Sequence, residues 1–579
     1  MQDFVRPAFF YAMWRRLRRG IPGFIKGVLR RRSEILLPNR ETREYRLWIG
    51  ERVRERQSIY NEALEPGLLS VLTPVWNGSP VRYLKKLAES VTAQNRDGAC
   101  QWVILDNGCS NASLVSYLAD LRAYGWVKLF RVETNIGITG GLRYCLEHAS
   151  GRYVLPVDAD DYLYPDAFQV VTSFLKREGY PPLLYTDEDK VIGSRFFHPY
   201  LKPDWDPVLL LNSAYIAHLG VIDREKALEL GAYSDSGTEG SPDWDLFIRF
   251  MIAGYTAAHI PEVLYSWRVH AHSTADDAAI KPYVHSSQKA ALQRFVDAQS
   301  NPARFSVEYS PLLGGAAHWY FSRQHSNPRA LVSAVLASGS GKEGSQPNSD
   351  YPEIERVFVS IASKTACLAA VAEKVADQDG FVHLISEDVE IDADMNSGAW
   401  NWAWEALTLF ELHPDTMMVG GRIRNRNGII TEAGRYFGFA GACGCPDRGR
   451  SFLDPGYFGQ IWKQRSVSAV STQFAVIKAV FLLELLTVLP EEASLAFLGA
   501  WAGAYAARSG KRIVYSPFLS GISDLDWDSL VLPSETDFFS ELNKNLIPDR
   551  RFYSRHLSLE KPFALGQELS SHTKLKVAS

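Results

Sequence analysis

A short acidic run, Val157-Asp158-Ala159-Asp160-Asp161, ends a hydrophobic stretch of the chain. Carboxylates at positions i and i+2 of an extended segment project to the same side, so Asp158 and Asp160 can converge on one hard cation. A cation held there could bind a diphosphate and neutralise the charge that develops on it as it leaves. An acidic loop after a strand is often only a solvated turn, so this interpretation depends on its surroundings.

A second polar turn, Asp106-Asn107-Gly108, also follows an apolar run. An acidic or amide side chain at this place can accept the imide N–H of uracil or thymine, and Trp76 offers a face on which a base can stack. The alternative interpretation is structural, because the same three residues are a favourable turn sequence.

Asp243 is the candidate general base. It lies in the segment 239–245, directly before the helical sequence 246–253. The dipole of a helix keeps a carboxylate near its N-terminus ionised, and an ionised carboxylate can accept a proton. The alternative is that Asp243 only caps the helix.

The elements that must position these residues alternate between strands and helices. Strands are predicted at 68–75, 102–106, 127–132 and 153–158, and helices at 83–93, 111–124 and 140–149. This alternation predicts an α/β fold with a mainly parallel sheet and helices on both of its faces. Such a sheet binds ligands at the carboxyl ends of its strands, where Asp106 and Asp158 stand.

The chain of 579 residues exceeds the size of one hydrophobic core, so two or three domains are expected. Its net charge of −4 provides no basic field that would attract nucleic acid. Its six cysteines lack the paired spacing of zinc ligands and indicate reduced thiols in a cytosolic protein. Cys443 and Cys445 could form a soft-metal or redox pair, but the preferred interpretation is two small buried residues without chemistry.

Residues 1–32 form a basic, aromatic-rich segment. Nine Lys or Arg residues stand against one acid, Asp3, and are interleaved with Phe9, Phe10, Trp14 and other apolar residues. This amphipathic composition favours attachment to an anionic membrane surface, and a solvated or partner-docked helix is the alternative. Neither a transmembrane helix nor a cleavable signal peptide is expected.

Composition shifts predict the division of the chain into parts. Residues 1–67 would hold the basic segment and a helical connector, and 68–300 the catalytic domain. Residues 301–352 would be a connector whose Gly/Ser-rich part, 337–352, separates two globular units. A second α/β domain would follow at 353–540, and 541–579 would be a tail.

The order of the motifs is more specific than any one of them. They occur at 69–77, 106–108, 135–137, 158–161, 185–190, 197–205, 239–245 and 267–274. In this order they resemble the family 2 glycosyltransferases of GT-A fold, which is a Rossmann-like α/β fold. The likeness is greatest to the bacterial branch that builds O-antigen and other surface polysaccharides, and it covers residues 68–275.

The resemblance implies a role for each matching residue. The nucleotide base of a sugar donor would be bound by Pro74, Trp76, Asp106 and Asn107. Its diphosphate and a divalent metal would be bound by Asp158 and Asp160, with His270 as a further ligand, although His272 is close enough to take that place. The general base would be Asp243, and the segment facing the sugar or acceptor would include Asp187, Glu188 and Lys202.

Two residues depart from the family pattern. Asn107 stands where the family has a second acid, which leaves the preference for a nucleotide base open, and Arg143 replaces a frequent asparagine.

The implied reaction is a single in-line displacement with inversion at the anomeric carbon, catalysed by a hexosyltransferase-like enzyme that uses Mn²⁺ or Mg²⁺. The donor would be a nucleotide sugar and the acceptor a growing, lipid-linked bacterial glycan. The enzyme would be cytoplasmic and peripheral on the cytoplasmic face of the inner membrane, and homo-oligomerisation is left open.

A second, degenerate copy of the domain is expected beyond the linker. The sequence Leu384-Ile385-Ser386-Glu387-Asp388 resembles the strand and acidic turn of the family. An ungapped comparison places Gly499 and Trp501 where relatives have the acids of the base motif. The segment before Glu387 also falls short of a full nucleotide-binding half. This copy is expected to serve packing, acceptor binding or dimerisation.

Two other functions are open to the same composition. A nucleotidyltransferase would need a basic, Gly-rich loop near its first strand, and the segment 73–78 is not basic. A catalytically dead carbohydrate-binding or scaffold protein with two pseudo-transferase domains fits the second domain, but the first retains every acid that the chemistry requires.

Overall fold

The computed structural model describes residues 40–270, 284–310, 312, 319–339, 351–352, 354–392 and 401–566. The described residues form two compact units. The first draws on Met1–Trp205, Ser213–Ser300 and Tyr309–Trp319, and the second on Asp206–Asn212, Asn301–Glu308 and Tyr320–Ser579. The basic segment 1–32 and His272 lie outside the described residues.

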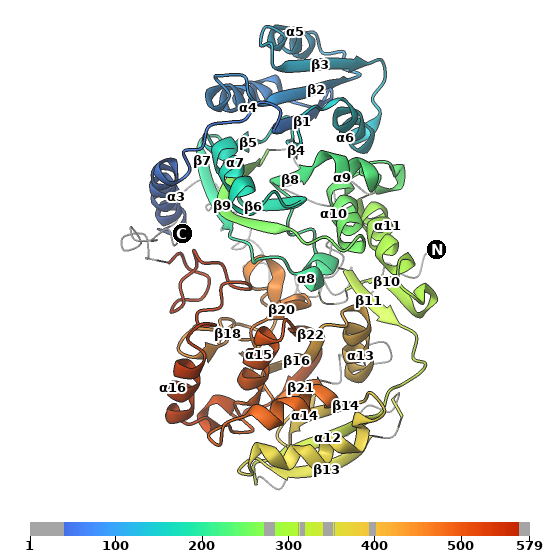
Figure 1. The fold of residues 1–579 in the computed structure, drawn as a ribbon, viewed down its shortest axis with the longest axis vertical. Helices are drawn as coiled ribbons and strands as arrows, with labels where there is room; N and C mark the ends of the chain where they lie inside the picture. The colour runs from blue at the N-terminus through green and yellow to red at the C-terminus, as the bar shows by residue number, and fades with distance from the viewer. Residues whose placement is uncertain are drawn as a thin grey trace, which may run out of the picture. The chain divides into compact units, whose positions relative to one another are not determined.

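The first unit is built on a mixed sheet. Among the described residues, nine strands form it in the order β3-β2-β1-β4-β8-β6-β9-β5, with β7 paired to β6 (Figure 1). The strands are β1 (Leu69–Val75), β2 (Gln101–Asn107), β3 (Val127–Val132), β4 (Tyr153–Pro156), β5 (Tyr162–Leu163), β6 (Leu183–Ile192), β7 (Arg195–Tyr200), β8 (Gly220–Asp223) and β9 (Ala258–Arg268). The strands β3, β2, β1 and β4 run parallel, as predicted, whereas β8 is antiparallel to both of its neighbours.

Helices cover both faces of the parallel half. The helices of this unit are α3 (Arg40–Ile59), α4 (Val81–Gln94), α5 (Ala112–Leu121), α6 (Gly137–His148), α7 (Ala167–Arg177), α9 (Arg224–Glu229), α10 (Pro242–Ile252) and α11 (Val284–Asp297). All seven residues of β1 are buried, and alternate ones, including Val71 and Val75, share a core with Leu84 and Leu87 of α4. The helix α6 lies on the other side of β1 in Figure 1. Burial on both faces explains why the strand sequences are continuous apolar runs.

The predicted connector is an integral helix of the first unit. In α3, Arg56 is fully buried and donates from Nε and Nη2 to the two carboxylate oxygens of Asp166, at 2.6 and 2.9 Å. From the same helix Tyr45 donates to Asp189 at 2.6 Å. Breaking a buried ion pair by removing one partner costs about 3–5 kcal/mol, because the other charge stays buried. The helix α3 therefore belongs to the first unit, although it precedes residue 68.

The second unit carries a sheet of its own. Among the described residues its order is β13-β12-β14-β21-β16-β22-β15, with β17 paired to β16 and β20 to β22. The strands are β12 (Leu331–Ala337), β13 (Glu355–Ser360), β14 (Phe381–Ser386), β15 (Glu390–Ile391), β16 (Thr416–Arg424), β17 (Ile430–Glu432), β20 (Arg465–Val467), β21 (Phe474–Lys478) and β22 (Arg512–Ile522). Two further pairs are β10 (Phe305–Tyr309) with β11 (Trp319–Arg323), and β18 (Tyr436–Phe437) with β19 (Cys443–Gly444). Its helices are α8 (Pro207–Asn212), α12 (Ala369–Ala376), α13 (Trp402–Leu412), α14 (Ala479–Val488), α15 (Leu498–Arg508) and α16 (Pro533–Leu542).

The two sheets have the same topology. The path β2-β1-β4-β8-β6-β9-β5 of the first sheet matches β13-β12-β14-β21-β16-β22-β15 of the second, in spatial order and in order along the chain. Neighbours in both paths pair in turn parallel, parallel, antiparallel, antiparallel, parallel and antiparallel. The described part of the second sheet has no counterpart of β3. A second α/β domain is therefore present, with one strand fewer at one edge.

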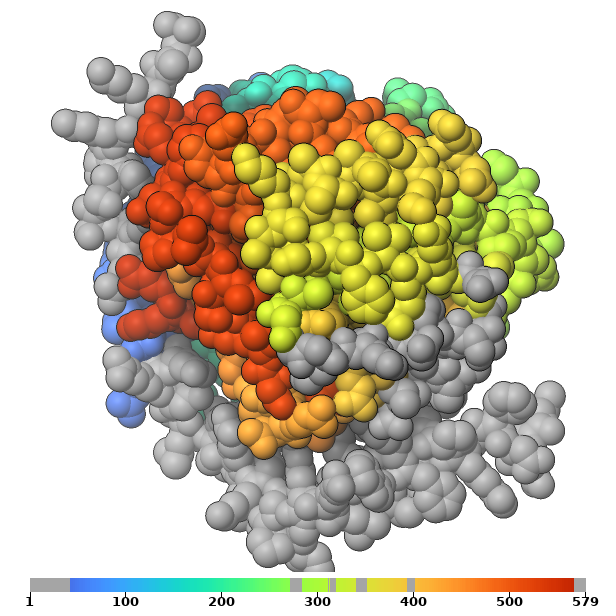
Figure 2. Space-filling view, turned by 90° about the horizontal axis from the view of Figure 1, so that it is seen from below, coloured from blue at the N-terminus to red at the C-terminus, as the bar shows by residue number. Residues whose placement is uncertain are grey.

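The Gly/Ser-rich segment 337–352 lies inside the second unit. It joins β12 to β13, which are neighbouring parallel strands of one sheet, so it does not separate the units as its composition indicated. The nucleotide-binding half that the sequence comparison found too short begins with β12, before this segment. Its edge strand β13 has Phe358 at 55% exposure and belongs to the yellow region at the surface in Figure 2.

A short segment from the first half of the chain completes the second unit. The carboxylate of Asp206 accepts hydrogen bonds from the backbone N–H and the hydroxyl of Ser466, both at 2.7 Å. At the end of α8, Asn212 donates to Gln464 at 3.2 Å. The chain thus leaves the first unit after Trp205 and returns to it at Ser213. Within the described residues no helix has the length and apolar character needed to cross a membrane.

Candidate active site

The predicted metal-binding acids follow β4. Asp158 is exposed, and Asp160 lies two residues further with 31% of its side chain exposed. Asp160 Oδ2 is 2.7 Å from Nε2 of His270, a residue that follows β9 and is far away in sequence. The structure therefore brings together Asp160 and His270 from two separate motifs.

A third acid fixes the loop that carries them. The buried carboxylate of Asp161 accepts a hydrogen bond from the hydroxyl of Tyr265 at 2.5 Å and another from the backbone N–H of Arg268 at 2.7 Å. Burial, followed by the charges of Asp158 and Asp160, raises the pKa of Asp161 well above its usual value. The sequence motif contained Asp161 but gave it no role, and its contacts show that it ties the acidic loop to β9.

The carboxylates of Asp158 and Asp160 suit a hard cation that is also coordinated by a bound ligand. Within the described residues no group of three or more His, Cys, Asp or Glu side chains is arranged to enclose a metal. Mg²⁺ in nucleotide sites is usually held by one or two carboxylates together with phosphate oxygens, so a closed protein cage is not required. The accessible carboxylates of Asp158 and Asp160 fit that pattern.

The predicted nucleotide-base residues stand at the ends of β1 and β2. Asp106 is buried, and its carboxylate accepts from the backbone N–H of Cys109 at 2.9 Å and from Arg131 at 2.7 Å. After β1, the indole of Trp76 is 54% exposed. An exposed indole beside a buried acid at the carboxyl ends of parallel strands leaves a ring face open for stacking.

Asn107 has a structural task in this arrangement. Its amide donates to the backbone C=O of Gly137 and accepts from the N–H of Ile136, both at 2.9 Å. Its side chain thus holds the loop before α6, where Gly137 takes φ +80°. On the face below, Pro74 lies so close to Gly141 that an added Cβ would come within 2.8 Å of it. The predicted contact of Asn107 with a nucleotide base would compete with these two hydrogen bonds.

Asp243 is the second residue of α10, after Pro242. The residue at the N-cap position is Ser241, so Asp243 is not the capping residue. It is half-buried, and burial raises the pKa of its carboxyl to about 6. A carboxylate that titrates near neutral pH at a helix N-terminus is suited to accept a proton.

Glu239 connects the segment before α10 to the first turn of α6. Its two carboxylate oxygens accept from the backbone N–H groups of Ile138 and Thr139, at 2.8 and 3.0 Å. A carboxylate at a helix N-terminus satisfies unpaired N–H groups and interacts favourably with the dipole. This contact was not foreseen from the sequence, since 100 residues separate Glu239 from Thr139.

The residues expected to face the acceptor form a buried network. Lys202 is fully buried, and its ammonium donates to Glu188 at 3.0 Å and to the carbonyls of Ala217 and His218 at 2.9 and 2.8 Å. Burial raises the pKa of Glu188 to about 7 although Lys202 opposes that shift. These three partners give Lys202 a structural role, and its predicted place beside an acceptor stays a prediction.

Asp187 lies at the centre of the same network. One oxygen accepts from the backbone N–H of Lys202 at 2.7 Å and lies 2.9 Å from His259 Nε2. Its other oxygen is buried without a hydrogen-bond partner among the described residues. Asp187 and His259 thereby join β6 to β9.

At the position in the second unit that corresponds to the proposed base, the described helix has a glycine. The helices α10 and α15 both have 11 residues, so Asp243 and Asp245 correspond in position to Gly499 and Trp501. A Cβ added to Gly499 would lie 1.8 Å from the carbonyl oxygen of Val470. The backbone of the neighbouring segment therefore occupies the space that an acid would need.

The acidic loop and the segment after the last strand also differ in the second unit. Five residues, 157–161, join β4 to β5, but only three, 387–389, join β14 to β15. In the first sheet Tyr162 of β5 pairs with Ser266 of β9, and in the second sheet Glu390 of β15 pairs with Ile522 of β22. Ser266 and Ile522 therefore correspond. The residues four positions later, His270 and Asp526, correspond as well.

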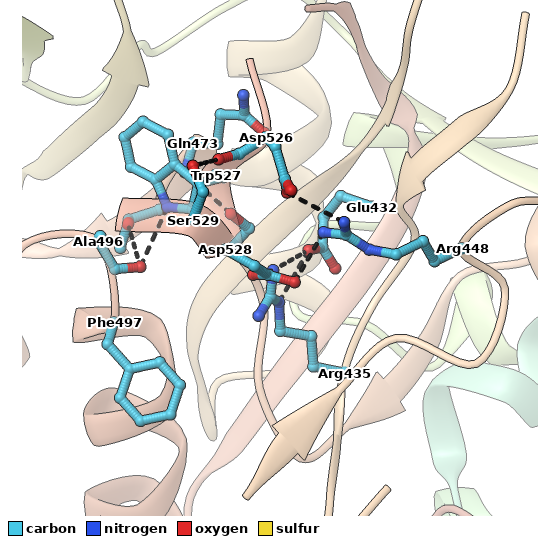
Figure 3. Close-up of polar contacts among 12 residues, drawn as sticks. Glu432, Arg435, Arg448, Gln473, Ala496, Phe497, Asp526, Trp527, Asp528 and Ser529 are labelled. Atoms are coloured by element: carbon cyan, nitrogen blue, oxygen red, sulfur yellow. Dashed lines mark hydrogen bonds and ion pairs between the residues drawn. The ribbon is translucent and has the colours of Figure 1, made fainter. Parts of the chain in front are cut away.

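Salt bridges fill this part of the second unit (Figure 3). Asp526 pairs with Arg448 at 3.1 Å, and Asp528 pairs with Arg448 at 2.7 Å and with Arg435 at 2.6 Å. Between the two acids, Trp527 is buried and donates to the carbonyl of Ala496 at 3.0 Å. Asp526 and Asp528, which follow β22, therefore form ion pairs with arginines of the second unit.

A family model matches part of the first unit. Residues 70–194 match the model described as Glycosyl transferase family 2. This range contains the two acidic turns, Asp106-Asn107 and Asp158–Asp161, and ends within the hairpin of β6 and β7.

Curated relatives extend the likeness along the chain. "Uncharacterized protein y4gI" of Sinorhizobium fredii is 29% identical over 457 residues, which is 71% of this chain and 48% of that protein. "O-antigen biosynthesis protein RfbC" of Myxococcus xanthus is 25% identical over 352 residues, which is 58% of this chain and 26% of that protein. The chain therefore spans about half or less of the length of these two relatives.

Among solved structures, "S. aureus TarS 1-349 in complex with UDP-GlcNAc" matches with a TM-score of 0.33 at 18% identity, covering 40% of this chain and 66% of that chain.

Proposed function

We propose that the first unit, in which residues 70–194 match the model of Glycosyl transferase family 2, transfers a hexose with inversion from a nucleotide sugar to a bacterial surface polysaccharide. The observation that carries this proposal is the convergence of two motifs that are far apart in sequence, since Asp160 Oδ2 lies 2.7 Å from His270 Nε2.

The proposed base and metal ligands have separate tasks. Asp243 removes the proton from the acceptor hydroxyl as the acceptor oxygen forms a bond to the anomeric carbon. The bond from that carbon to the diphosphate oxygen breaks in the same step, and the nucleoside diphosphate departs with its electron pair. A single displacement of this kind inverts the configuration and requires no covalent intermediate on the protein.

Asp158 and Asp160, with His270 beside them, would hold Mn²⁺ or Mg²⁺ together with the diphosphate. The cation supplies charge neutralisation at the departing diphosphate. Asp161 keeps the two ligands in place through Tyr265 and β9. Trp76 and Asp106 would receive the nucleotide base, and Asn107 supports the adjoining loop.

The acceptor is proposed to be a growing, lipid-linked glycan of O-antigen or capsule type. Support comes from the likeness to a protein named for O-antigen biosynthesis, and from the basic, aromatic composition of residues 1–32. The protein would then act at the cytoplasmic face of the inner membrane. Flotation of the full chain and of a chain lacking 1–32 with anionic vesicles tests this attachment, and equal flotation would remove it.

We propose that the second unit is a degenerate transferase fold that serves packing or acceptor binding. Its matching topology supports a common origin with the first unit, and the space filled by Val470 at Gly499 supports the loss of the base. The ion pairs of Asp526 and Asp528 also support the proposal that this unit is degenerate.

A binding panel tests the proposed function. Nucleoside diphosphates with uracil, thymine, guanine and adenine bases are titrated into wild type with and without Mn²⁺ or Mg²⁺, and the melting temperature is followed. A ligand that binds only the folded state raises that temperature. Cation-dependent stabilisation by one of them is expected, with its loss in Asp158→Ala. A scaffold without a donor site would show no stabilisation by any nucleotide.

A further inference from the structure

The last residue of β9, Arg268, carries a guanidinium that no carboxylate binds. The residue is only 5% exposed. Among the described residues its side chain forms no ion pair and one hydrogen bond, from Nε to the backbone C=O of Asp160 at 2.7 Å. Arginines are rarely buried in proteins unless a counter-charge is bound to them. A cation of this kind at the edge of a candidate active site indicates an anionic ligand.

The two terminal nitrogens of Arg268 are accessible to such a ligand. Neither has a hydrogen-bond partner among the described residues, and neither is among the side-chain nitrogens that are completely buried without one. They therefore keep contact with solvent, although the rest of the residue is nearly buried. The N–H groups on these nitrogens form the planar fork with which arginine binds phosphate through two parallel hydrogen bonds.

The position of Arg268 beside the acidic loop is fixed by direct contacts. Its Nε is bound to the carbonyl of Asp160, and its backbone N–H donates to the carboxylate of Asp161 at 2.7 Å. The carboxylate of Asp160, of which 31% is exposed, lies 2.7 Å from His270 Nε2. The guanidinium therefore adjoins the loop and the histidine that were assigned to the metal and the diphosphate.

An aromatic ring from the nucleotide-binding half holds the plane of the guanidinium. Its central carbon lies 4.7 Å from the centre of the Tyr83 ring, in the first turn of α4. The same ring is 5.3 Å from the ring of His270. A cation over the face of a tyrosine is stabilised by the charge distribution of the ring. Because Arg268 is held both at Nε and by this ring, little of its freedom would be lost when a ligand binds.

We propose that Arg268 binds the diphosphate of the nucleotide-sugar donor, with its terminal N–H groups donating to phosphate oxygens beside Asp160. This inference rests on the proposed function. In that reaction the bond between the anomeric carbon and a diphosphate oxygen breaks, and its electron pair stays on the diphosphate. A guanidinium already in place at that group stabilises the negative charge that it gains. The buried cation of Arg268 then acquires the counter-charge that the described residues do not provide.

The test measures what the second phosphate adds to binding. UMP and UDP, dTMP and dTDP, and GMP and GDP are titrated into each protein by calorimetry, once with Mn²⁺ and once with EDTA. Arg268→Met removes the charge and keeps an unbranched side chain. The matched control is Arg82→Met, because Arg82 is exposed and its guanidinium lies 4.6 Å from the centre of the same Tyr83 ring.

For the nucleotide that binds wild type, Arg268→Met should weaken binding of the diphosphate by about 10- to 100-fold, the usual worth of hydrogen bonds to a charged group. Binding of the monophosphate should stay nearly unchanged. With EDTA, wild type should still prefer the diphosphate, and Arg268→Met should lose that preference. Arg82→Met should change either dissociation constant by less than about fivefold, because water and salt screen an exposed charge.

A second variant keeps the test open if Arg268→Met does not fold, which circular dichroism shows. Arg268→Lys retains the charge but not the planar fork, so it should weaken the diphosphate less than Arg268→Met and again leave the monophosphate unaffected. Weakening of both ligands by the same factor in Arg268→Lys would contradict the inference.

Four outcomes overturn the inference. Unchanged binding of the diphosphate in folded Arg268→Met would leave the guanidinium without this ligand, and equal weakening of both nucleotides would place it away from the second phosphate. A loss seen only with Mn²⁺ would mean that Arg268 acts by positioning Asp160. An equal loss in Arg82→Met would mean that only the total charge near the loop matters. Failure of every nucleotide to bind wild type would instead remove the proposed function, and this inference with it.

Discussion

The two units of this chain share one sheet topology but differ at three places where the first unit gathers its polar groups. At the second residue of the helix before the last long strand, the first unit has Asp243 and the second has Gly499. After the strand that ends at Pro156, five residues carry three acids, whereas the counterpart loop has three residues. After the last long strand, the first unit has His270 beside Asp160, and the second has Asp526 paired with an arginine.

This contrast separates what maintains the fold from what performs the chemistry. The strands of both sheets are apolar runs buried on two faces, and that pattern tolerates many sequences as long as volume and polarity are kept. The site depends on single positions where a helix, a loop and a strand end meet. In the second unit those positions are filled by backbone, by a shorter loop and by ion pairs, while every strand pairing of the shared path is kept.

The largest expected difference concerns the acids after β4. Asp158→Ala or Asp160→Ala should bring transfer below detection and remove cation-dependent nucleotide binding, because both carboxylates are exposed enough to be ligands and neither supports the core. Release of nucleoside diphosphate in the presence of a membrane extract containing acceptor glycans measures the first effect. Circular dichroism confirms the fold. Full turnover by either variant would contradict the assignment of the metal ligands.

Asp243→Asn comes next in size. Removal of a general base typically lowers the rate by a factor of about 10² to 10⁴, and binding of the donor should stay near that of wild type. The matched control is Asp245→Asn in the same helix turn, whose carboxylate is already bound by Arg249 and Arg294 at 2.6 Å each. This control should lose stability and keep its turnover per folded molecule. An undiminished rate in Asp243→Asn would remove the base from the mechanism.

The pH dependence of the rate should report the same carboxyl. Burial raises the pKa of Asp243 to about 6, so kcat/KM should fall about tenfold for each pH unit below 6 and level off above it. The free energy of unfolding should change with pH in the opposite direction to the rate. A raised carboxyl pKa favours the protonated folded state, so its contribution is present below the ordinary pKa and is lost as the pH rises toward 6. Wild type should therefore lose stability relative to Asp243→Asn between pH 4 and 6, and parallel melting curves would contradict this.

Strand order and acid positions were accessible from the sequence because both depend on local pattern. The strands predicted at 68–75, 102–106 and 127–132 appear as β1, β2 and β3, and the ungapped comparison chose Gly499 and Trp501, which are the second and fourth residues of α15. Contacts over long separations were not accessible. The apolar strand β12 stands before the Gly/Ser-rich segment, and only its pairing with β13 reveals that the segment is internal.

The roles of individual polar side chains were the least predictable part. Lys202 and Asn107 match motif positions, yet three carbonyl or carboxylate partners hold the first, and the loop before α6 holds the second. A motif shows which residue is present but not which atoms surround it.

Substitution by alanine at the second residue of α15 and of α10 should have different effects on the free energy of unfolding. In Gly499→Ala the added Cβ would meet the carbonyl of Val470 at 1.8 Å, so the second unit should lose stability on the order of 1–3 kcal/mol or more through displaced backbone. The matched change Asp243→Ala removes a half-buried carboxyl and should leave the first unit as stable or more stable. Denaturant unfolding followed by tryptophan fluorescence measures both variants. A Gly499→Ala protein as stable as wild type would mean that α15 can shift, and that the position could once again carry a side chain.

The smallest effect is expected from the acids that the second unit still has. Glu387→Gln and Asp388→Asn, alone or together, should leave transfer by the full chain within about twofold of wild type, because Gly499 provides no base beside them. The hydroxyl of Ser338 lies 2.8 Å from an oxygen of each carboxylate and can donate its proton to one of them, a contact that the amides can largely reproduce. Ser338→Ala removes that donor and tests whether the loop has only this structural task.

The same nucleoside diphosphate release assay is used for all of these variants, with protein concentration corrected for folded fraction. A loss of activity beyond tenfold in a folded Glu387→Gln or Asp388→Asn protein would assign chemistry to the second unit. The correspondence between Asp243 and Gly499 would then have compared the wrong helix positions, and the two units would have to share the reaction.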